Sequence, residues 1–541
     1  MEWNRGFWIL MCGFFLTLNL QAQDHRFMVF FSDKGTAYSL DEPLEFLSQR
    51  AVDRRVRQDI SLTDQDLPVN PLYVQGLRDL GITVLYSTKW FNGVLVETDS
   101  AQLATIQSLS YVNGVEHVAP GPLLPQTGKI KSFKHKKRQV SGSRTQSTDF
   151  QNQILGIDEM HNSGFKGEGM LIAVFDGGFE GVNSATAFQH LITGNKVQFA
   201  YDFVGNSSNV YRYDDHGTRA LSVIGGNESG VFTGGAYEAD FVLCVTEDVF
   251  SEYRVEEYNW AFAAEAADSA GVDIINTSLG YNIFDDAGMN YTIDDLDGQT
   301  TVISQAASMA ATKGMVLTMS AGNSGNALWQ KITAPADALD VLAVGAINSD
   351  STKASFSSFG PSADQRIKPD VVALGVSTAL INSSGTLVFN NGTSFSAPQV
   401  ASLVAGFWQN NPELNYRQVI ESIKNSGDQA LNPDNEKGSG IPNFIRAGQV
   451  ILELDEERLQ KTVSLFPNPL GQYLFLVSKQ PITEAWLTMH SITGQAVVDS
   501  KLSNIKANQK IPVDLPDLDP GVYIVTLRSN RHTQSFRLIK Y

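Results

Sequence analysis

The chain has 541 residues, of which 42% are hydrophobic and 10% aromatic, so it can bury cores of ordinary size. At about 150 residues per domain, this length corresponds to roughly three or four domains. The formal net charge of −18 disfavours a nucleic acid as a partner of the whole chain and is typical of a soluble protein.

The first 22 residues have the features of a secretory signal. Arg5 precedes an apolar run over residues 6–18, which is too short to span a bilayer, and Ala22 offers a cleavage point. A buried helix or a retained anchor is the alternative interpretation. No other apolar run of the sequence reaches membrane length, so we expect no transmembrane segment in the mature protein.

Cysteine is rare in this chain. Removal of the signal would leave Cys244 alone, so no intramolecular disulfide could form and stability would depend on packing or bound ions. Because Cys244 lies in a β-like apolar run, we interpret it as a buried structural thiol and not as a nucleophile.

Residues 24–125 predict a small α+β domain with helices on one face of an antiparallel sheet. The expected order is strand, helix, two strands, helix and strand, at residues 27–31, 50–57, 82–86, 93–98, 101–109 and 112–118. No catalytic cluster occurs in this stretch. Residues 126–148 are basic, rich in serine and glycine and without periodicity, which indicates an exposed linker.

The next informative stretch is an apolar run over residues 169–175 that ends at Asp176. Such runs are typical of strands buried on both faces of a parallel sheet, and polar groups at their carboxyl ends face a binding crevice. Glycines of a dinucleotide-binding fingerprint follow a strand, whereas Gly164, Gly167 and Gly169 precede this one. An aspartate that simply ends a strand in a turn is the alternative.

His216 stands at the head of a second helix-like stretch of small and apolar residues. An imidazole with a pKa near ~6.5 is the natural general base around neutral pH. A surface or structural histidine is the alternative. Zinc binding is disfavoured because there is no His-Glu-x-x-His pattern and no second histidine at ligand spacing.

Two further strand-like runs end in small polar residues. The run over 272–277 leads into Ser278, Leu279 and Gly280, which could offer backbone groups to an extended peptide. The run over 316–320 leads to Asn323, whose amide could donate to an oxyanion, although turn asparagines are common.

Ser394 lies between Gly392 and a run of small residues that predicts a helix from about residue 397. Free N–H groups and the positive end of the helix dipole favour an ionising hydroxyl and an oxyanion beside it. Pro398 fits the first turn, where its missing N–H is not needed. A serine that caps an ordinary buried helix is the alternative.

Together, these motifs resemble those of the subtilisin-like serine proteases (subtilases, peptidase family S8), in that family's order Asp, His, Ser. The matching motifs are Asp-Gly-Gly at Asp176, His-Gly-Thr at His216, Ser-Leu-Gly at Ser278, Ala-Gly-Asn at Asn323 and Gly-Thr-Ser-x-x-x-Pro at Ser394. The resemblance implies an α/β fold, a subtilisin-like parallel sheet flanked by helices, over residues 149–452. The segment before it is similar in pattern to the inhibitory prodomain of these enzymes.

The resemblance also implies the role of each residue. Ser394 would attack the scissile carbonyl, His216 would accept and pass on its proton, and Asp176 would orient the imidazole. Asn323, with the backbone N–H of Ser394, would hold the oxyanion. The substrate cleft would be lined by Ser278, Leu279 and Gly280. Phe395 and Ser396 replace the family's usual Met and Ala, which affects packing and substrate preference.

No cofactor is implied for the chemistry, whereas structural calcium is compatible with the family. Asp294, Asp295 and Asp297 form an acidic turn, but they lack the spacing of an EF-hand and are better explained as an exposed acidic loop. The sequence therefore leaves the metal ligands unknown.

The C-terminal residues 462–541 predict a small all-β sandwich of short alternating strands at 473–477, 485–489, 511–515, 522–527 and 535–539. A carbohydrate-binding or spacer module is one interpretation. However, the Leu-Phe-Pro-Asn-Pro stretch at 465–469 and the basic-apolar end at 537–540 resemble the C-terminal sorting domain of the type nine (Por) secretion system.

These observations predict a secreted serine endopeptidase for protein or peptide substrates, which would also bind its own prodomain and the type IX secretion machinery. Its parts would be a signal peptide (1–22), an inhibitory prodomain (24–125), a cleavable basic linker (126–148), a peptidase domain (149–452) and a sorting domain (462–541). It would pass the periplasm and outer membrane and be secreted or held at the cell surface. The alternative is a catalytically silent surface adhesin on the same scaffold.

Overall fold

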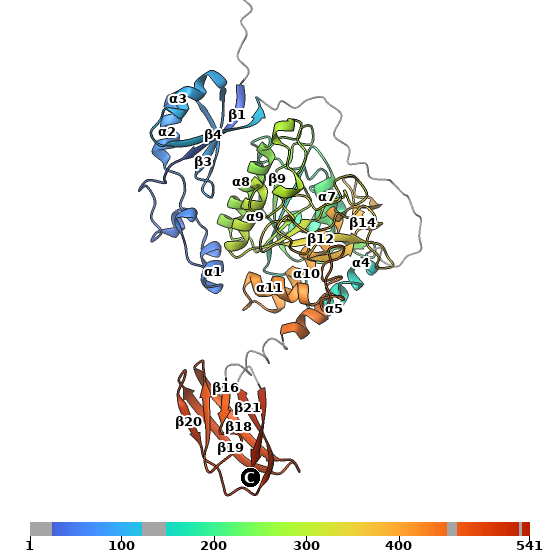
Figure 1. Cartoon of the computed structure of the whole chain (residues 1–541). Helices are drawn as coiled ribbons and strands as arrows, with labels where there is room; N and C mark the ends of the chain where they lie inside the picture. The colour runs from blue at the N-terminus through green and yellow to red at the C-terminus, as the bar shows by residue number, and fades with distance from the viewer. Residues whose placement is uncertain (1–23, 122–147, 452–462, 530–532) are drawn as a thin grey trace, which may run out of the picture.

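The computed structural model describes residues 24–121, 148–451, 463–529 and 533–541 (Figure 1). The predicted signal peptide and nearly all of the predicted linker lie outside these ranges. None of the helices within them has both the length and the apolar character that a membrane crossing requires.

The first domain is a four-stranded antiparallel sheet with the strand order β2-β3-β1-β4. Its elements are β1 (Asp24–Phe31), α1 (Gln49–Arg57), α2 (Pro71–Asp79), β2 (Thr83–Thr88), β3 (Gly93–Asp99), α3 (Leu103–Gln107) and β4 (Val112–Pro120). The predicted α+β order is confirmed. Helix α2 is an addition, although its start has a clear signal, since Asn70 caps it and Pro71 occupies its first turn.

Helix α1 departs from the expectation that the helices share one face of this sheet. It lies away from the sheet and against the long helix α8 (Val255–Ala270) of the next domain (Figure 1). The reason is electrostatic, because its buried side chains include Arg54 and Arg55, and both donate to Asp268 of α8.

The second domain is built on a seven-stranded parallel sheet with the order β13-β12-β11-β10-β5-β9-β6. Its strands are β5 (Leu171–Asp176), β6 (Val197–Asp202), β9 (Asp240–Val245), β10 (Ile274–Thr277), β11 (Val316–Ser320), β12 (Leu342–Ile347) and β13 (Val371–Leu374). Every residue of β5, β10, β11, β12 and β13 is buried, which explains their continuous apolar runs. The predicted parallel α/β sheet is confirmed.

Helices flank this sheet in two groups. Helix α8 packs on α9, and α7 packs on α10. The two pairs lie apart in Figure 1. The remaining elements of the domain are α4 (Asp149–Gln153), α5 (Ile157–Asn162), α6 (Gln189–Thr193), α7 (His216–Gly225), β7 (Asn227–Glu228), β8 (Phe232–Thr233), α9 (Val302–Thr312), β14 (Thr378–Ile381), β15 (Leu387–Asn390), α10 (Ala397–Asn410) and α11 (Tyr416–Asn425). Helix α10 is buried from Ala397 to Trp408, which accounts for its small residues.

The third domain is a β-sandwich, as predicted, with the sheets β16-β17-β20 and β19-β18-β21-β22. Its strands are β16 (Val463–Phe466), β17 (Leu474–Ser478), β18 (Ile482–Ser491), β19 (Ala496–Ile505), β20 (Lys510–Val513), β21 (Gly521–Ser529) and β22 (Thr533–Lys540). Both sheets contribute to one core. Strands β16 and β19 were missing from the prediction. Strand β16 has only four residues, and β19 is an edge strand that buries only Val498 and Ile505.

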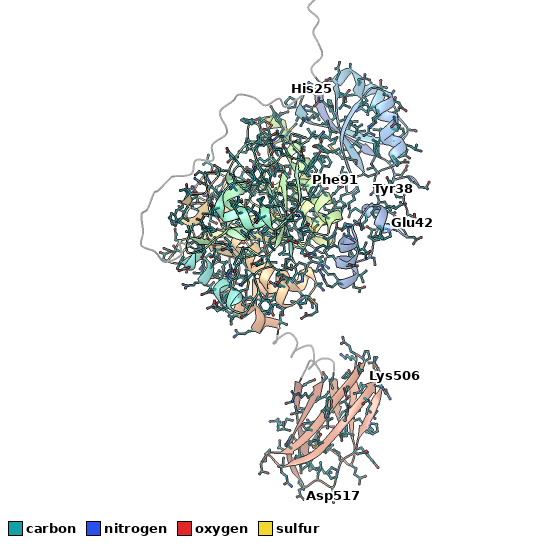
Figure 2. The ribbon with its side chains drawn as sticks, turned by 180° about the vertical axis from the view of Figure 1, so that it is seen from behind. His25, Tyr38, Glu42, Phe91, Lys506 and Asp517 are labelled. Atoms are coloured by element: carbon teal, nitrogen blue, oxygen red, sulfur yellow. The ribbon has the colours of Figure 1, made fainter. Side chains whose placement is uncertain are left out.

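Figure 2 shows the molecule from behind. His25 and Phe91 lie in the first domain, and Lys506 and Asp517 mark opposite ends of the β-sandwich.

Candidate active site

The predicted site residues gather at the carboxyl edge of the parallel sheet. Strand β10 lies between β5 and β11, and its last residue, Thr277, is paired with Phe175 on one side and Met319 on the other. Asp176 follows Phe175 directly, and Ser278 follows Thr277. The chain therefore leaves three neighbouring strands at one place, which is where an open α/β sheet presents a binding crevice.

Asp176 and His216 form a hydrogen bond at the centre of this edge. His216 Nδ1 lies 2.8 Å from Asp176 Oδ1, and Gly177 N donates to the same oxygen at 2.8 Å. Asp176 is fully buried and His216 is 4% exposed. Residue 217 must be glycine, because a Cβ there would lie 2.8 Å from the Cβ of Asp176.

Acidic groups dominate the electrostatics of His216. Burial acts to lower the pKa of His216, but the charge and hydrogen bond of Asp176, followed by the charges of Asp214 and Glu247, outweigh it and raise the pKa to about 9. Asp214 Oδ1 also accepts from the backbone N–H of His216 at 2.9 Å. The imidazole is thus held by carboxylates that favour its protonated form.

Ser394 lies in a short 3₁₀ turn, η7 (Thr393–Phe395), just before α10. Its Oγ donates to the carbonyl of Ser278 at 3.1 Å, and Ser278 Oγ donates to the carbonyl of Ser394 at 2.8 Å. The ring of Phe395 lies 5.5 Å from that of His216, centroid to centroid. These contacts bring Ser394, Ser278 and His216 together from segments far apart in the sequence.

Asn323 is fixed by the residue before the serine. Its Oδ1 accepts from Thr393 N at 2.9 Å and from Thr393 Oγ1 at 3.0 Å. With the oxygen engaged there, the amide N–H₂ of this exposed residue is left to point to another acceptor. Thr393 was not singled out from the sequence, although it stands inside the Gly-Thr-Ser motif.

The segment Ser278, Leu279 and Gly280 runs past the serine. Ser278 and Leu279 are buried and Gly280 is exposed. Ser320 Oγ donates to the carbonyl of Leu279 at 3.2 Å, which anchors the segment to the end of β11.

Cys244 is a buried free thiol in β9, and burial raises its pKa. The interpretation as a structural thiol agrees with this environment.

An acidic cluster lies in the loop between β9 and α8. Glu247, Glu252 and Glu256 each offer an oxygen, and these oxygens lie within 4.8 Å of one another. Burial and the charges of Glu252 and Asp176 raise the pKa of Glu247 well above its ordinary value. Within the described ranges, this is the cluster that brings three potential metal ligands together. No sequence motif marks this cluster, because the spacing of the three glutamates matches no metal-binding pattern.

The acidic turn noted in the sequence is a different feature. Asp295 Oδ2 accepts from the N–H and hydroxyl of Thr292, and Asp297 Oδ1 accepts from the N–H groups of Gln299 and Thr300. Asp295 and Asp297 therefore stabilise their own turn.

Comparison with known protein families shows which family the chain belongs to. The model of the subtilase family matches residues 167–441, just over half of the chain. The chain belongs to the subtilase family. In family and fold it is a subtilisin-like serine endopeptidase.

Two further family models match the flanks of this subtilase. A peptidase S8 propeptide domain of Bacteroidota matches residues 26–135, and a secretion system C-terminal sorting domain matches residues 464–541. The latter indicates type IX secretion to the cell surface or the extracellular space.

Several known subtilases are similar to the chain at modest identity. Serine protease AprX of Bacillus subtilis (strain 168) is 29% identical over 317 residues, which cover 53% of this chain and 66% of AprX, just under two thirds. Subtilisin DY of Bacillus licheniformis is 28% identical over 298 residues, covering 55% of this chain and 97% of that protein. The crystal structure of MycP1 with its N-terminal propeptide removed has a TM-score of 0.44 at 25% identity and covers 55% of this chain and 96% of that one.

Proposed function

We propose that this subtilase is a secreted endopeptidase that hydrolyses peptide bonds through Asp176, His216 and Ser394 and an acyl-enzyme intermediate. The observation that carries the proposal is the 2.8 Å hydrogen bond between Asp176 and His216, placed beside the turn that bears Ser394. No part of the proposal requires a cofactor for the chemistry.

The reaction begins with the hydroxyl of Ser394. At rest it donates to the carbonyl of Ser278, so it must turn toward Nε2 of His216, which takes the proton as Oγ attacks the scissile carbonyl. Asp176, which receives Nδ1–H, fixes the tautomer in which Nε2 carries no proton and can act as base, and it stabilises the imidazolium. His216 then gives the proton to the leaving amine, and water hydrolyses the acyl-enzyme by the same steps.

The tetrahedral oxyanion would be held by Asn323 and by the backbone N–H of Ser394. Thr393 supports this role because it occupies the oxygen of the Asn323 amide and leaves the N–H₂ group as a donor. The backbone of Ser278, Leu279 and Gly280 would pair with the substrate as an additional strand.

The flanking domains would act before and during export. The first domain, residues 24–125, would inhibit the enzyme until the linker at 126–148 is cut, and residues 462–541 would direct the protein from the periplasm across the outer membrane. N-terminal sequencing of the mature protein is expected to give a start within 126–148. A start before residue 124 would contradict this division.

The decisive experiment labels the purified mature protein with a fluorophosphonate probe and follows casein hydrolysis in the same samples. Wild type is expected to label and to cleave, and Ser394→Ala to do neither. The matched control is Ser396→Ala, because this buried serine lies two positions away, donates to the carbonyl of Ala373, and should leave both signals in place. A wild-type protein that neither labels nor cleaves would favour the silent adhesin.

A further inference from the structure

Thr333 lies where two chain segments beside the proposed nucleophile come together. They are the substrate segment, residues 278–281, and the oxyanion segment, residues 321–323. The backbone N–H of Thr333 donates to the carbonyl of Ala321 at 3.2 Å, and the carbonyl of the next residue accepts from the backbone N–H of Tyr281 at 2.8 Å. Thr333 is 6% exposed, so these bonds hold its side chain inside the domain.

The side chain of Thr333 fills the space between the two segments. A Cβ on Gly280 would lie 2.2 Å from Thr333 Oγ1, and a Cβ on Gly322 would lie 3.0 Å from the same atom. The hydroxyl is therefore in close contact with the backbone on both sides. No side chain could stand at position 280 without moving Thr333.

The hydroxyl of Thr333 also lacks a partner. Thr333 Oγ1 is buried and forms no hydrogen bond with any residue that the structure describes. Buried hydroxyls are rarely left unpaired. An apolar group pressed against this one would keep it from water and from any other partner, which is unfavourable by itself. The space that Thr333 fills is thus both narrow and polar.

The proposed chemistry brings one substrate residue to this space. Ser394 Oγ donates to the carbonyl of Ser278 in the substrate segment. Thr393, the residue before the nucleophile, donates to Asn323 in the oxyanion segment. The attacking oxygen and the scissile carbonyl therefore lie between the two segments. The side chain next to that carbonyl, on the residue before the scissile bond, would point into the space that Thr333 fills.

We propose that Thr333 restricts the residue before the scissile bond to a small side chain, that of glycine, alanine or serine. This inference rests on the proposed function and names its class of substrate. A leucine or phenylalanine side chain would have to displace Thr333 and would leave its hydroxyl unpaired, whereas a small side chain ends above it. One misfit methylene in a substrate pocket typically changes kcat/KM by about 10–200-fold.

The test measures kcat/KM of the mature protein on internally quenched peptides that differ only in the residue before the scissile bond, with mass spectrometry to confirm the bond that is cut. Alanine or serine at that place is expected to give a kcat/KM about tenfold or more above that of leucine or phenylalanine. Thr333→Gly, which empties the space, should raise the ratio of phenylalanine to alanine cleavage by about tenfold or more. Thr333→Ala should shift the ratio in the same direction by less. A ratio within one protein does not depend on how much of that protein is folded.

Thr333→Val is the matched variant, because it keeps the volume of the side chain and removes the hydroxyl. It should keep most of the preference for alanine over phenylalanine. Three results would overturn this inference and leave the proposed function standing: a wild-type preference for leucine or phenylalanine, an unchanged ratio in Thr333→Gly and Thr333→Ala, or an equal loss of preference in Thr333→Val and Thr333→Gly. A wild-type protein that cleaves none of the peptides and takes up no fluorophosphonate would contradict the proposed function, and this inference would be overturned with it.

Discussion

One carboxylate oxygen of Asp176 accepts hydrogen bonds from two donors. This geometry determines the orientation and the protonation of the His216 imidazole. Oδ1 receives both His216 Nδ1 and Gly177 N, so the carboxylate cannot rotate freely. The same charge that orients the imidazole also stabilises its protonated form, together with Asp214. The charge of Asp176 therefore both orients the imidazole and raises the pKa of His216.

The pH dependence of the reaction follows from this coupling. A base must be neutral to accept a proton, so kcat/KM should rise with pH through the pKa of His216, about 9. Because the charge of Asp214 raises that pKa, Asp214→Asn should move the profile toward lower pH while its Oδ1 still accepts from His216 N. The measurement is kcat/KM against pH on a peptide substrate, and an identical profile for both proteins would contradict the argument.

Variants of Asn323 and of its partner Thr393 should weaken the proposed oxyanion contact to different degrees. Asn323→Ala should lower kcat by about 10²–10³ with little change in KM, because the lost donor acts on the transition state. Thr393→Val keeps the backbone N–H bond to Asn323 Oδ1 and loses the hydroxyl bond, so it should cost less. Steady-state kinetics of both variants test this order, and a larger kcat loss for Thr393→Val would be inconsistent with it.

At the scale of elements, α1 and α8 form a charged contact between the first two domains. Asp268 on α8 is fully buried and accepts from Arg54 and Arg55 of α1 and from Lys89, the residue after β2. Burial alone would raise the pKa of Asp268, but the charges of Lys89, Arg54 and Arg55 hold it well below its usual range.

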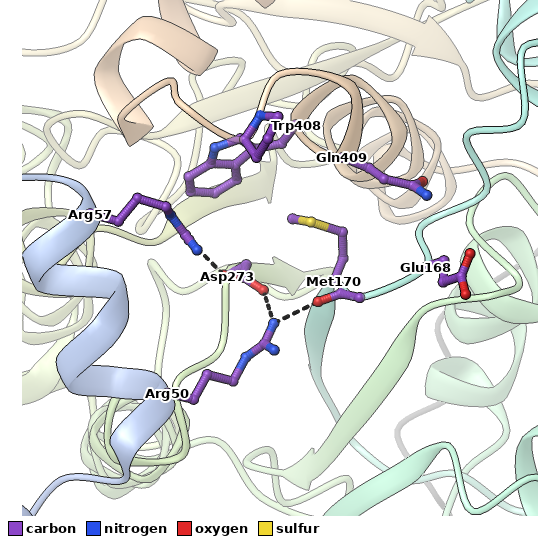
Figure 3. Close-up of a pocket in the computed structure, with 9 residues that line it drawn as sticks. Arg50, Arg57, Glu168, Met170, Asp273, Trp408 and Gln409 are labelled. Atoms are coloured by element: carbon purple, nitrogen blue, oxygen red, sulfur yellow. Dashed lines mark hydrogen bonds and ion pairs between the residues drawn. The ribbon is translucent and has the colours of Figure 1, made fainter.

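A pocket lies beside this contact between α1 and α8. Figure 3 shows Arg50 and Arg57 of α1 facing Asp273, and Arg50 Nη2 lies 2.5 Å from Asp273 Oδ2. Trp408 of α10 lies across the same pocket. The two arginines are nearly half exposed, so this ion pair contributes less than the buried one.

Removing the charge of Asp268 should therefore loosen the first domain. Asp268→Asn leaves three cations without their shared partner, and breaking a buried pair typically costs about 3–5 kcal/mol. We expect a lower unfolding midpoint and faster limited proteolysis of residues 24–121 in the full chain with Ser394→Ala. Asp340→Asn, which breaks the exposed pair with Arg417, is the control and should cost about 0–1 kcal/mol. Equal losses of stability in the two variants would contradict the role of Asp268 as the buried partner of these cations.

The pH dependence of this contact has a definite sign. Since the folded-state pKa of Asp268 lies below its unfolded value, its contribution is present above the unfolded pKa and is lost as pH falls toward the folded one. Acid should thus weaken the contact between the first two domains.

At the scale of the whole molecule, the three matched families place a protease between an N-terminal propeptide and a C-terminal export signal. The β-sandwich has its own core, which explains why it can act as a separate module. Its export function can be tested without reference to catalysis.

Deletion of residues 463–541 should stop export at the periplasm. The peptidase domain would still fold, because none of its core residues comes from the sandwich. Fractionation of cells that express the full chain or the truncated one, with a periplasmic marker as control, measures the effect. Normal release of the truncated protein would contradict the proposed export role of residues 463–541.

The sequence by itself determined the fold class and predicted the residues of the proposed site. Apolar runs that end in Asp176, Ser278 and Asn323 are a local property of strands buried on both faces, and the motifs around His216 and Ser394 are local as well. The same holds for the β-sandwich, apart from the short strand β16 and from β19, whose polar edge position removes the alternation that marks a strand.

Tertiary structure alone decided which groups meet across the chain. Three features depend on contacts between segments that share no sequence motif. They are the hydrogen bond from Thr393 to Asn323, the packing of α1 against α8, and the cluster of Glu247, Glu252 and Glu256. Buried charge is the physical reason in the last two cases. A charged side chain is buried only where the fold brings a partner to it, and sequence spacing does not encode that meeting.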